Sequence, residues 1–131
     1  MILVDSNIPM YLVGAVHSNK DAARRALEEA VAAGQTLCTD AEVLQEILHR
    51  FTAIRRPDKI DPAFDAVLGI VDVVYPIERS DVDRARRILR TTPHISARDA
   101  VHISVMQAHD IDQILSFDRH LDGIPGIVRV S

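Results

Sequence analysis

Acidic side chains follow two apolar runs of the sequence, at the points where buried strands would end. Asp5 directly follows Met1–Val4, and Asp118 comes two residues after Ser116, the last residue of another apolar run. Short apolar, β-branched runs are typical of the covered strands of a parallel sheet. In such sheets, sites form beyond the carboxyl ends of the strands. Asp5 and Asp118 are therefore candidates for one site, although each alone is equally well explained as a turn or cap.

Asp99 lies at the start of a segment, from about 96 to 109, that is apolar nearly all round and so predicts a buried helix. Asp99 shares a stripe of this helix with Ile103 and Met106. A carboxylate aimed into a core has to be paired, hydrogen-bonded or bound to a metal. The alternative is a capping box with the Ser96 backbone, although Asp is shorter than the usual Glu or Gln.

Two further acids, Glu42 and Glu46, lie on a helix that we expect to be capped by Thr39 or Asp40. On a helical wheel Glu46 is nearer the edge of the apolar arc, and Glu42 points outward. The wheel alone favours an exposed pair between Glu46 and Arg50.

Carboxylates that meet at one point need a cation. Each like-charge pair costs about 4 kcal/mol at about 4 Å with an effective dielectric of 20. All-oxygen ligation selects a hard ion, Mg²⁺ or Mn²⁺, and such an ion suits hydrolysis of phosphodiesters. No Cys-His or Ser-His pair stands at matching positions to act as a nucleophile.

Strand-like runs alternate with helical segments along the whole chain. This alternation predicts an α/β domain with a mainly parallel sheet of about five strands and helices on both faces. We find no linker, so we expect residues 1–131 to form a single domain. The strand candidates are 1–4, 36–38, 71–75, 113–116 and 127–130, and the helix candidates are 9–13, 20–33, 40–54, a segment from 61, 80–90 and 96–109.

The composition excludes several classes of protein. With 131 residues, 47% hydrophobic and 26% charged, the chain can bury a core. No apolar run approaches the roughly 18 residues of a membrane span, and no basic leader precedes Asp5, so we expect neither a span nor a secretory signal. Cys38 is the only cysteine, which fits a reducing cytoplasm. The net charge of −4 excludes binding of polyanions by bulk charge.

Four segments resemble, in order and spacing, the acidic motifs of PIN-domain nucleases, and the likeness covers essentially the whole chain. The best register places the glutamate of the family at Glu46, with Glu42 as the alternative. The segments are Ile2-Leu3-Val4-Asp5-Ser6-Asn7, Thr39-Asp40-Ala41-Glu42-Val43-Leu44-Gln45-Glu46, Ala97-Arg98-Asp99-Ala100-Val101-His102 and Ile114-Leu115-Ser116-Phe117-Asp118-Arg119.

This resemblance implies a three-layer α/β/α domain that binds Mg²⁺ or Mn²⁺ and cleaves RNA. Single-domain members are commonly VapC-type toxins held inactive by a VapB-like antitoxin, so the expected partners are RNA, that antitoxin and a second copy in a homodimer. Asn7 and Ser116 match positions that support the site by hydrogen bonds, and Ser116 keeps the hydroxyl of the more common Thr. Carried over by position, the acidic site is Asp5, Glu46, Asp99 and Asp118.

RNA contacts have to come from local basic patches. Arg98 and Arg119 stand beside the proposed acids, and we expect them at the mouth of the site. Without interleaved aromatics, recognition of RNA shape or of a structured loop is expected. Other candidates are Arg84, Arg86, Arg87 and Arg90 on one helix and Arg55, Arg56 and Lys59 in a loop.

Alternatives remain at this point. A Zn²⁺ site from Asp99 and His102 has no second histidine pair to complete it, so we expect His102 to line the core or the site. The small-residue stripe of 20–33 suits a dimer, an antitoxin helix or packing within the domain. A haloacid-dehalogenase-type phosphatase would need an acid where Asn7 stands. The remaining alternative is a non-catalytic binding module with the same fold.

Overall fold

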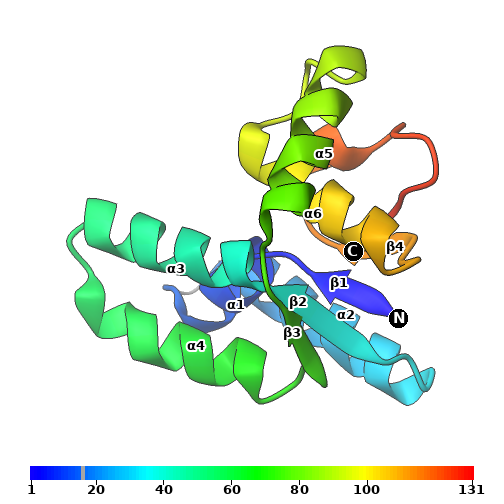
Figure 1. Cartoon of the computed structure of the whole chain (residues 1–131). Helices are drawn as coiled ribbons and strands as arrows, with labels where there is room; N and C mark the ends of the chain where they lie inside the picture. Colours follow the sequence, from blue (N-terminus) through cyan, green and yellow to red (C-terminus); the bar gives the residue numbers. More distant parts are fainter. Residues whose placement is uncertain (16) are drawn as a thin grey trace.

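The computed structural model describes residues 1–15 and 17–131 and shows a five-stranded, all-parallel sheet (Figure 1). The order across the sheet is β3-β2-β1-β4-β5, so β1 lies in the centre. Leu3 pairs with Cys38 of β2 on one side and with Ile114 of β4 on the other. Because all strands are parallel, their carboxyl ends meet at one edge. The strands are β1 (Ile2–Val4), β2 (Leu37–Asp40), β3 (Val73–Tyr75), β4 (Gln113–Leu115) and β5 (Val128–Val130).

Helices cover both faces of the sheet (Figure 1), which confirms the predicted three-layer α/β/α architecture. The strand β1 alternates between the two faces. Leu3 packs in the core beneath α5 and α6, whereas Ile2 and Val4 pack against α2. The helices are α1 (Asn7–Val13), α2 (Ser18–Ala32), α3 (Ala41–Ala53), α4 (Ile60–Leu68), α5 (Arg79–Thr91) and α6 (Ala97–Ala108), with short 3-10 turns η1 (Pro57–Lys59) and η2 (Arg119–Leu121).

The cap of α3 follows the predicted chemistry, whereas other helices begin one or two residues earlier than expected. Asp40 caps α3 by accepting from the Val43 N–H, as predicted. The α2 helix begins two residues early because the His17 side chain accepts from the Asn19 N–H and acts as its cap. The α4 helix begins at Ile60, one residue before the predicted segment, because the η1 turn runs directly into it.

The small-residue stripe of α2 packs within the domain. Ala23, Ala26, Leu27 and Ala30 are buried in the same cluster as Ile2 and Val4 of the sheet. These side chains are therefore not free to bind a dimer partner or an antitoxin helix. Over the described residues, no helix combines the length and the apolar character that crossing a membrane requires.

Candidate active site

Four predicted acids line one pocket at the carboxyl edge of the sheet. Asp5 follows β1, Asp118 follows the neighbouring β4, Asp99 lies in the first turn of α6, and Glu46 lies on α3. Residues more than a hundred positions apart in the sequence are thus brought together by the parallel sheet. The pocket has a volume of about 450 Å³ and is lined by Asp5, Ser6, Asn7, Glu46, His94, Ile95, Ser96, Arg98, Asp99, Asp118 and His120.

The buried Asp5 carboxylate is oriented by donors on both oxygens. The Ser6 N–H donates to Oδ1 at 2.7 Å, and the Ser116 hydroxyl donates to Oδ2 at 2.6 Å. Ser116 Oγ in turn accepts from the Asn7 amide at 3.0 Å and from the Asp118 N–H at 3.1 Å. Asn7 and Ser116 therefore hold Asp5 in place by hydrogen bonds, and the same hydroxyl connects Asp5 to the Asp118 loop.

Asp99 lies close to the carboxylates of Asp5 and Asp118. Its backbone N–H donates to Ser96 Oγ at 3.1 Å, so Ser96 caps α6 while the Asp99 side chain lies against the other acids. Burial, together with the charges of Asp5 and Asp118, raises the pKa of Asp99 to about 7. Burial also raises the pKa of Asp5, partly offset by His102 and the Ser116 hydroxyl. These raised pKa values mean that the pocket disfavours having all its carboxylates charged.

Glu46 faces inward, contrary to the exposed pairing with Arg50 that the wheel favoured. Its Oε1 lies 2.7 Å from His102 Nε2, and its Oε2 accepts from the Ser6 hydroxyl. His102 is fully buried, and its Nδ1 lies 2.7 Å from Asp40 Oδ2. Burial alone would lower the pKa of His102, but Asp40, Glu46 and Asp5 together raise it well above its ordinary value. Sequence reasoning gave Asp40 only a capping role and missed its contact with His102.

The other site candidates from the sequence, one glutamate and three arginines, differ in where they lie relative to the acidic pocket. Glu42 lies outside the lining of the acidic pocket, and burial and the charge of Glu46 raise its pKa. Arg98 lines the pocket, whereas the exposed Arg119 lies outside its lining. Arg84 is not a free surface group, because it donates to Ser104 across the α5–α6 interface.

The acidic cluster can hold a metal ion. One ligand atom each from Asp5, Glu46 and His102 lies within 4.8 Å of the others. Both ring nitrogens of His102 already face carboxylates, so the ligand atoms that the acids Asp5, Glu46, Asp99 and Asp118 offer here are oxygens. A divalent cation among these oxygens would offset the burial, and at Asp99 the repulsion by Asp5 and Asp118, that raise the pKa values of Asp5 and Asp99. The donor set therefore fits a hard cation.

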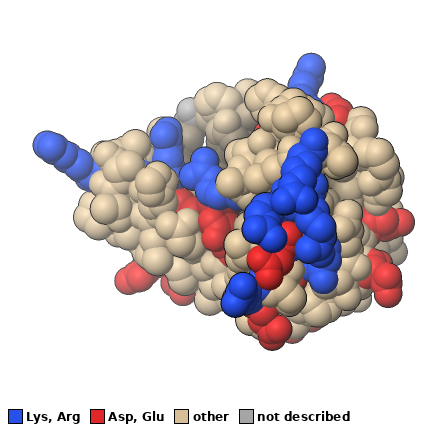
Figure 2. Space-filling view, turned by 45° about the horizontal axis from the view of Figure 1, so that its top comes forward, with Lys and Arg blue, Asp and Glu red and all other residues tan. Residues whose placement is uncertain are grey.

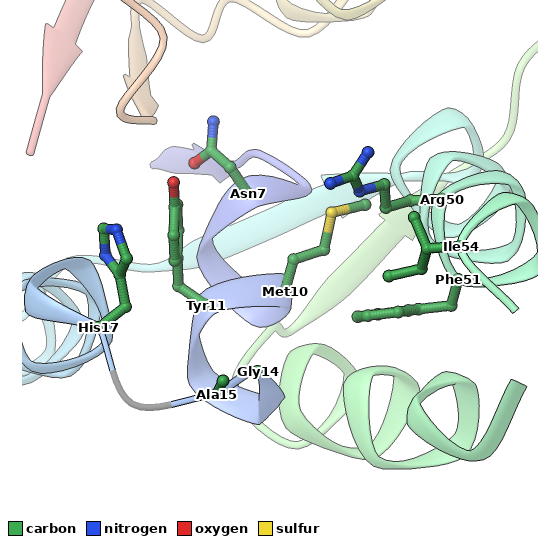
Figure 3. Close-up of a pocket in the computed structure, with 9 residues that line it drawn as sticks. All are labelled: Asn7, Met10, Tyr11, Gly14, Ala15, His17, Arg50, Phe51 and Ile54. Carbon is green, nitrogen blue, oxygen red and sulfur yellow. The ribbon is translucent and has the colours of Figure 1, made fainter. Parts of the chain in front are cut away.

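A second, less polar pocket adjoins the acidic one. It has a volume of about 350 Å³ and lies between α1, α3 and the segment before α2 (Figure 3). In Figure 3 the side chains of Met10, Phe51 and Ile54 lie between the helices, and Asn7 and Arg50 lie along the upper side. Asn7 lines both pockets, so a molecule in the apolar pocket would lie next to the acids.

Comparison with known proteins agrees with this geometry. Residues 2–127 match the family model described as PIN domain. Ribonuclease VapC13 of Mycobacterium tuberculosis is 60% identical over 131 residues, which cover 100% of both chains. The crystal structure of VapC20 from the same organism, a toxin that cleaves the sarcin–ricin loop, superposes with a TM-score of 0.74 at 21% identity, covering 90% of each chain. A toxin–antitoxin complex from Klebsiella pneumoniae gives a TM-score of 0.70 at 18% identity, covering 98% of this chain and 96% of the other. The chain therefore belongs to the PIN-domain family and, within it, to the VapC ribonucleases.

Proposed function

We propose that this chain is a toxin that hydrolyses RNA phosphodiester bonds with Mg²⁺ or Mn²⁺ held by Asp5, Glu46, Asp99 and Asp118. One observation carries the proposal: carboxylates from β1, β4, α3 and α6 converge in a single open pocket. Burial and, at Asp99, the charges of Asp5 and Asp118 raise the pKa values of Asp5 and Asp99, so a further cation would favour their charged forms. The membership in the VapC ribonucleases supports RNA as the substrate.

When bound, the ion supplies an activated water and positive charge for the oxygens that become negative during hydrolysis. The protein supplies orientation. The hydrogen bonds from Ser6 and Ser116 prevent rotation of the Asp5 carboxylate, and the same Ser116 hydroxyl holds the backbone that carries Asp118. Arg98, at the rim of the pocket, provides a cation for a phosphate of the incoming strand.

RNA outside the pocket has a basic surface to contact on α5. Four exposed arginines follow one face of this helix, and Arg79 is paired with Asp83. Figure 2 shows basic side chains gathered in a band on one side of the molecule, with acidic side chains beside it. The segment after α5 contains His94, Ile95 and Ser96, which line the acidic pocket, so this face leads to the site. The α5 arginine face consists of Arg79, Arg86, Arg87 and Arg90.

We also propose that a VapB-like antitoxin inhibits the chain, that the chain acts in the cytoplasm, and that it forms a homodimer. Two solved relatives are a toxin–antitoxin complex and a VapBC assembly. We place an apolar side chain of the antitoxin in the pocket of Figure 3, because this pocket is mostly apolar and adjoins the acids. Ile54→Asp, at a half-exposed position of its lining, should weaken antitoxin binding in calorimetry and leave RNA cleavage unchanged. Light scattering on the purified chain tests the homodimer.

The decisive experiment measures RNA cleavage by the purified chain with Mg²⁺, after EDTA and after restoring Mg²⁺. Cleavage should stop with EDTA and return with the metal. Asp5→Asn should remove cleavage, whereas the matched variant Asp21→Asn, at an exposed position of α2, should not. Full activity in EDTA would refute the role of the metal. Binding of Mn²⁺ and RNA without any cleavage would instead favour the non-catalytic module.

A further inference from the structure

His102 lies one turn beyond Asp99 on α6 and has no role in the hydrolysis described above. Its side chain is fully buried, and each of its ring nitrogens lies 2.7 Å from a carboxylate oxygen. Nδ1 faces Asp40 at the end of β2, and Nε2 faces Glu46 on α3. Because ionised carboxylates can only accept hydrogen bonds, both ring nitrogens act as donors in this arrangement.

The contacts on either side of His102 fix its orientation. Asp40 is itself held, because its other oxygen, Oδ1, accepts from the Val43 N–H at 2.9 Å. The ring is therefore anchored to the end of the sheet through Asp40. On the other side, Glu46 is held at both oxygens, by His102 on Oε1 and by the Ser6 hydroxyl on Oε2.

Such anchoring matters most for Glu46. A glutamate has three rotatable side-chain bonds, and ordering them costs side-chain entropy. The other acids of the pocket follow strands or begin a helix, whereas Glu46 reaches the pocket from the middle of α3. Each carboxylate oxygen has two lone-pair positions, so Glu46 keeps acceptor capacity for a cation after bonding to His102 and Ser6.

His102 itself is poorly placed to be a ligand. A ring nitrogen has one position for either a proton or a metal, and Nε2 uses it for Glu46. The nearest Asp5 oxygen is 3.7 Å from that nitrogen, which is longer than a hydrogen bond.

We propose that Asp40 and His102 are positioning residues that orient the Glu46 carboxylate toward the metal, and that His102 is not a metal ligand. This role rests on the proposed metal-dependent function. Removal of a group that orients a metal ligand lowers the affinity for the metal by about 10- to 100-fold.

Replacement of His102 by Gln or by Asn separates the two contacts of its ring. The amide nitrogen of Gln lies as many bonds from Cβ as Nε2 of His, and the amide nitrogen of Asn as many as Nδ1. His102→Gln thus retains a donor for Glu46, whereas His102→Asn retains only the contact with Asp40. We expect His102→Asn to weaken Mn²⁺ binding, measured by calorimetry, by about 10- to 100-fold, and His102→Gln to stay within about threefold of the unaltered chain.

A control separates this effect from destabilisation. Ser104 is also a buried polar residue of α6, and its hydroxyl donates to the Asp81 carbonyl, outside the site. Ser104→Ala should lower the melting temperature and leave Mn²⁺ affinity unchanged. If His102→Asn lowers the melting temperature but binds Mn²⁺ as the unaltered chain does, the positioning role is wrong and His102 serves only packing.

A spectroscopic test compares the unaltered chain with His102→Gln. Because His94 and His120 also line the pocket, electron spin-echo modulation of bound Mn²⁺ should show no directly coordinated nitrogen that is lost in His102→Gln. A directly bound nitrogen that disappears in His102→Gln, or equal loss of affinity in His102→Gln and His102→Asn, would identify His102 as a ligand and overturn the proposal. An unaltered chain that binds no Mn²⁺ would refute the metal-dependent function itself, whereas normal binding with an unaffected His102→Asn would refute only the positioning role.

Discussion

The acidic site has two halves that differ in how the negative charge of the carboxylates is balanced. In the open half, Asp5, Asp99 and Asp118 face the pocket, where His102 is 3.7 Å from Asp5 and the exposed His120 is 3.1 Å from Asp118. Burial and repulsion raise the pKa of Asp99 to about 7. In the closed half, Asp40 and Glu46 lie on either side of the buried His102, at 2.7 Å each.

This difference indicates which acids have their charge neutralised within the protein and which keep it for a cation. Buried charges are tolerated when they are paired and hydrogen-bonded, as in the closed half. Carboxylates that are left unpaired destabilise the folded chain until a cation binds, as in the open half. We therefore expect substitutions in the open half to reduce activity without lowering stability in EDTA, and substitutions in the closed half to lower stability as well as to weaken metal binding.

The largest effect is expected for Asp99→Asn. Loss of this carboxylate should reduce Mg²⁺-dependent RNA cleavage by roughly 10³-fold, since it removes charge that holds the catalytic ion. The same change relieves repulsion with Asp5 and Asp118, so unfolding by urea in EDTA should require more denaturant than for the unaltered chain. A variant that is inactive and also less stable would contradict the division between the two halves.

In the closed half, Asp40→Ala should destabilise the fold by about 3 kcal/mol or more. It leaves the buried His102 with one fewer carboxylate and removes the cap of α3. Urea unfolding measures this loss, and Asp21→Ala at an exposed position of α2 is the control. A loss below about 1 kcal/mol would show that the ion pair with His102 contributes little.

The dependence of folding stability on pH should reflect the ionisation of Asp99 in the open half. The pKa of Asp99 is raised from 3.8 to about 7, so its protonated form favours the folded state. That stability is present at low pH and is lost as pH rises through about 4 to 7. We expect a loss of about 2 kcal/mol, less than the full shift would give, because water in the open pocket screens the charge.

Urea unfolding in EDTA across this pH range measures the loss. Asp99→Asn should flatten the profile, and saturating Mn²⁺ should restore stability above pH 7. If the free energy of unfolding still falls steeply with pH in Asp99→Asn, another titratable group causes the pH dependence.

The smallest effect is expected outside both halves, on the α5 arginine face. Replacement of Arg86, Arg87 and Arg90 by Gln should raise the KM for a structured RNA several-fold and reduce the slope of log affinity against log salt by about 2. Cleavage of a very short RNA that reaches only the pocket should be unaffected. The control replaces Arg24 and Arg25 of α2, on the other face of the sheet. Equal effects in both variants would indicate general loss of charge.

Sequence patterns predicted much of the fold because the relevant signals are local. Alternating apolar runs and helical stripes identified the strands and helices, and Asp40, one of the two candidate caps, caps α3. The alternation of strands with helices predicted a mainly parallel sheet, and the structure shows an all-parallel one whose strand order the sequence analysis left open. That residues 1–131 form a single domain stays a prediction.

The position of Glu46 shows where such reasoning stops. A helical wheel describes one helix in isolation, and it favoured exposure of Glu46 beside Arg50. The inward orientation depends on Ser6 and His102, which come from other elements. Only the resemblance to PIN-domain nucleases selected Glu46 over Glu42, and the role of Asp40 beyond its cap had no signal in the sequence.

The amino-acid sequence by itself determined the strand and helix order and the acids that follow the strands, because periodicity and capping act over a few neighbouring residues. The tertiary structure decided which charges are neutralised inside the protein and which remain for an ion. Such a decision depends on distances between residues as far apart in the chain as Asp40 and His102. Coulomb energies and burial at those distances arise only once the sheet and its helices are packed together.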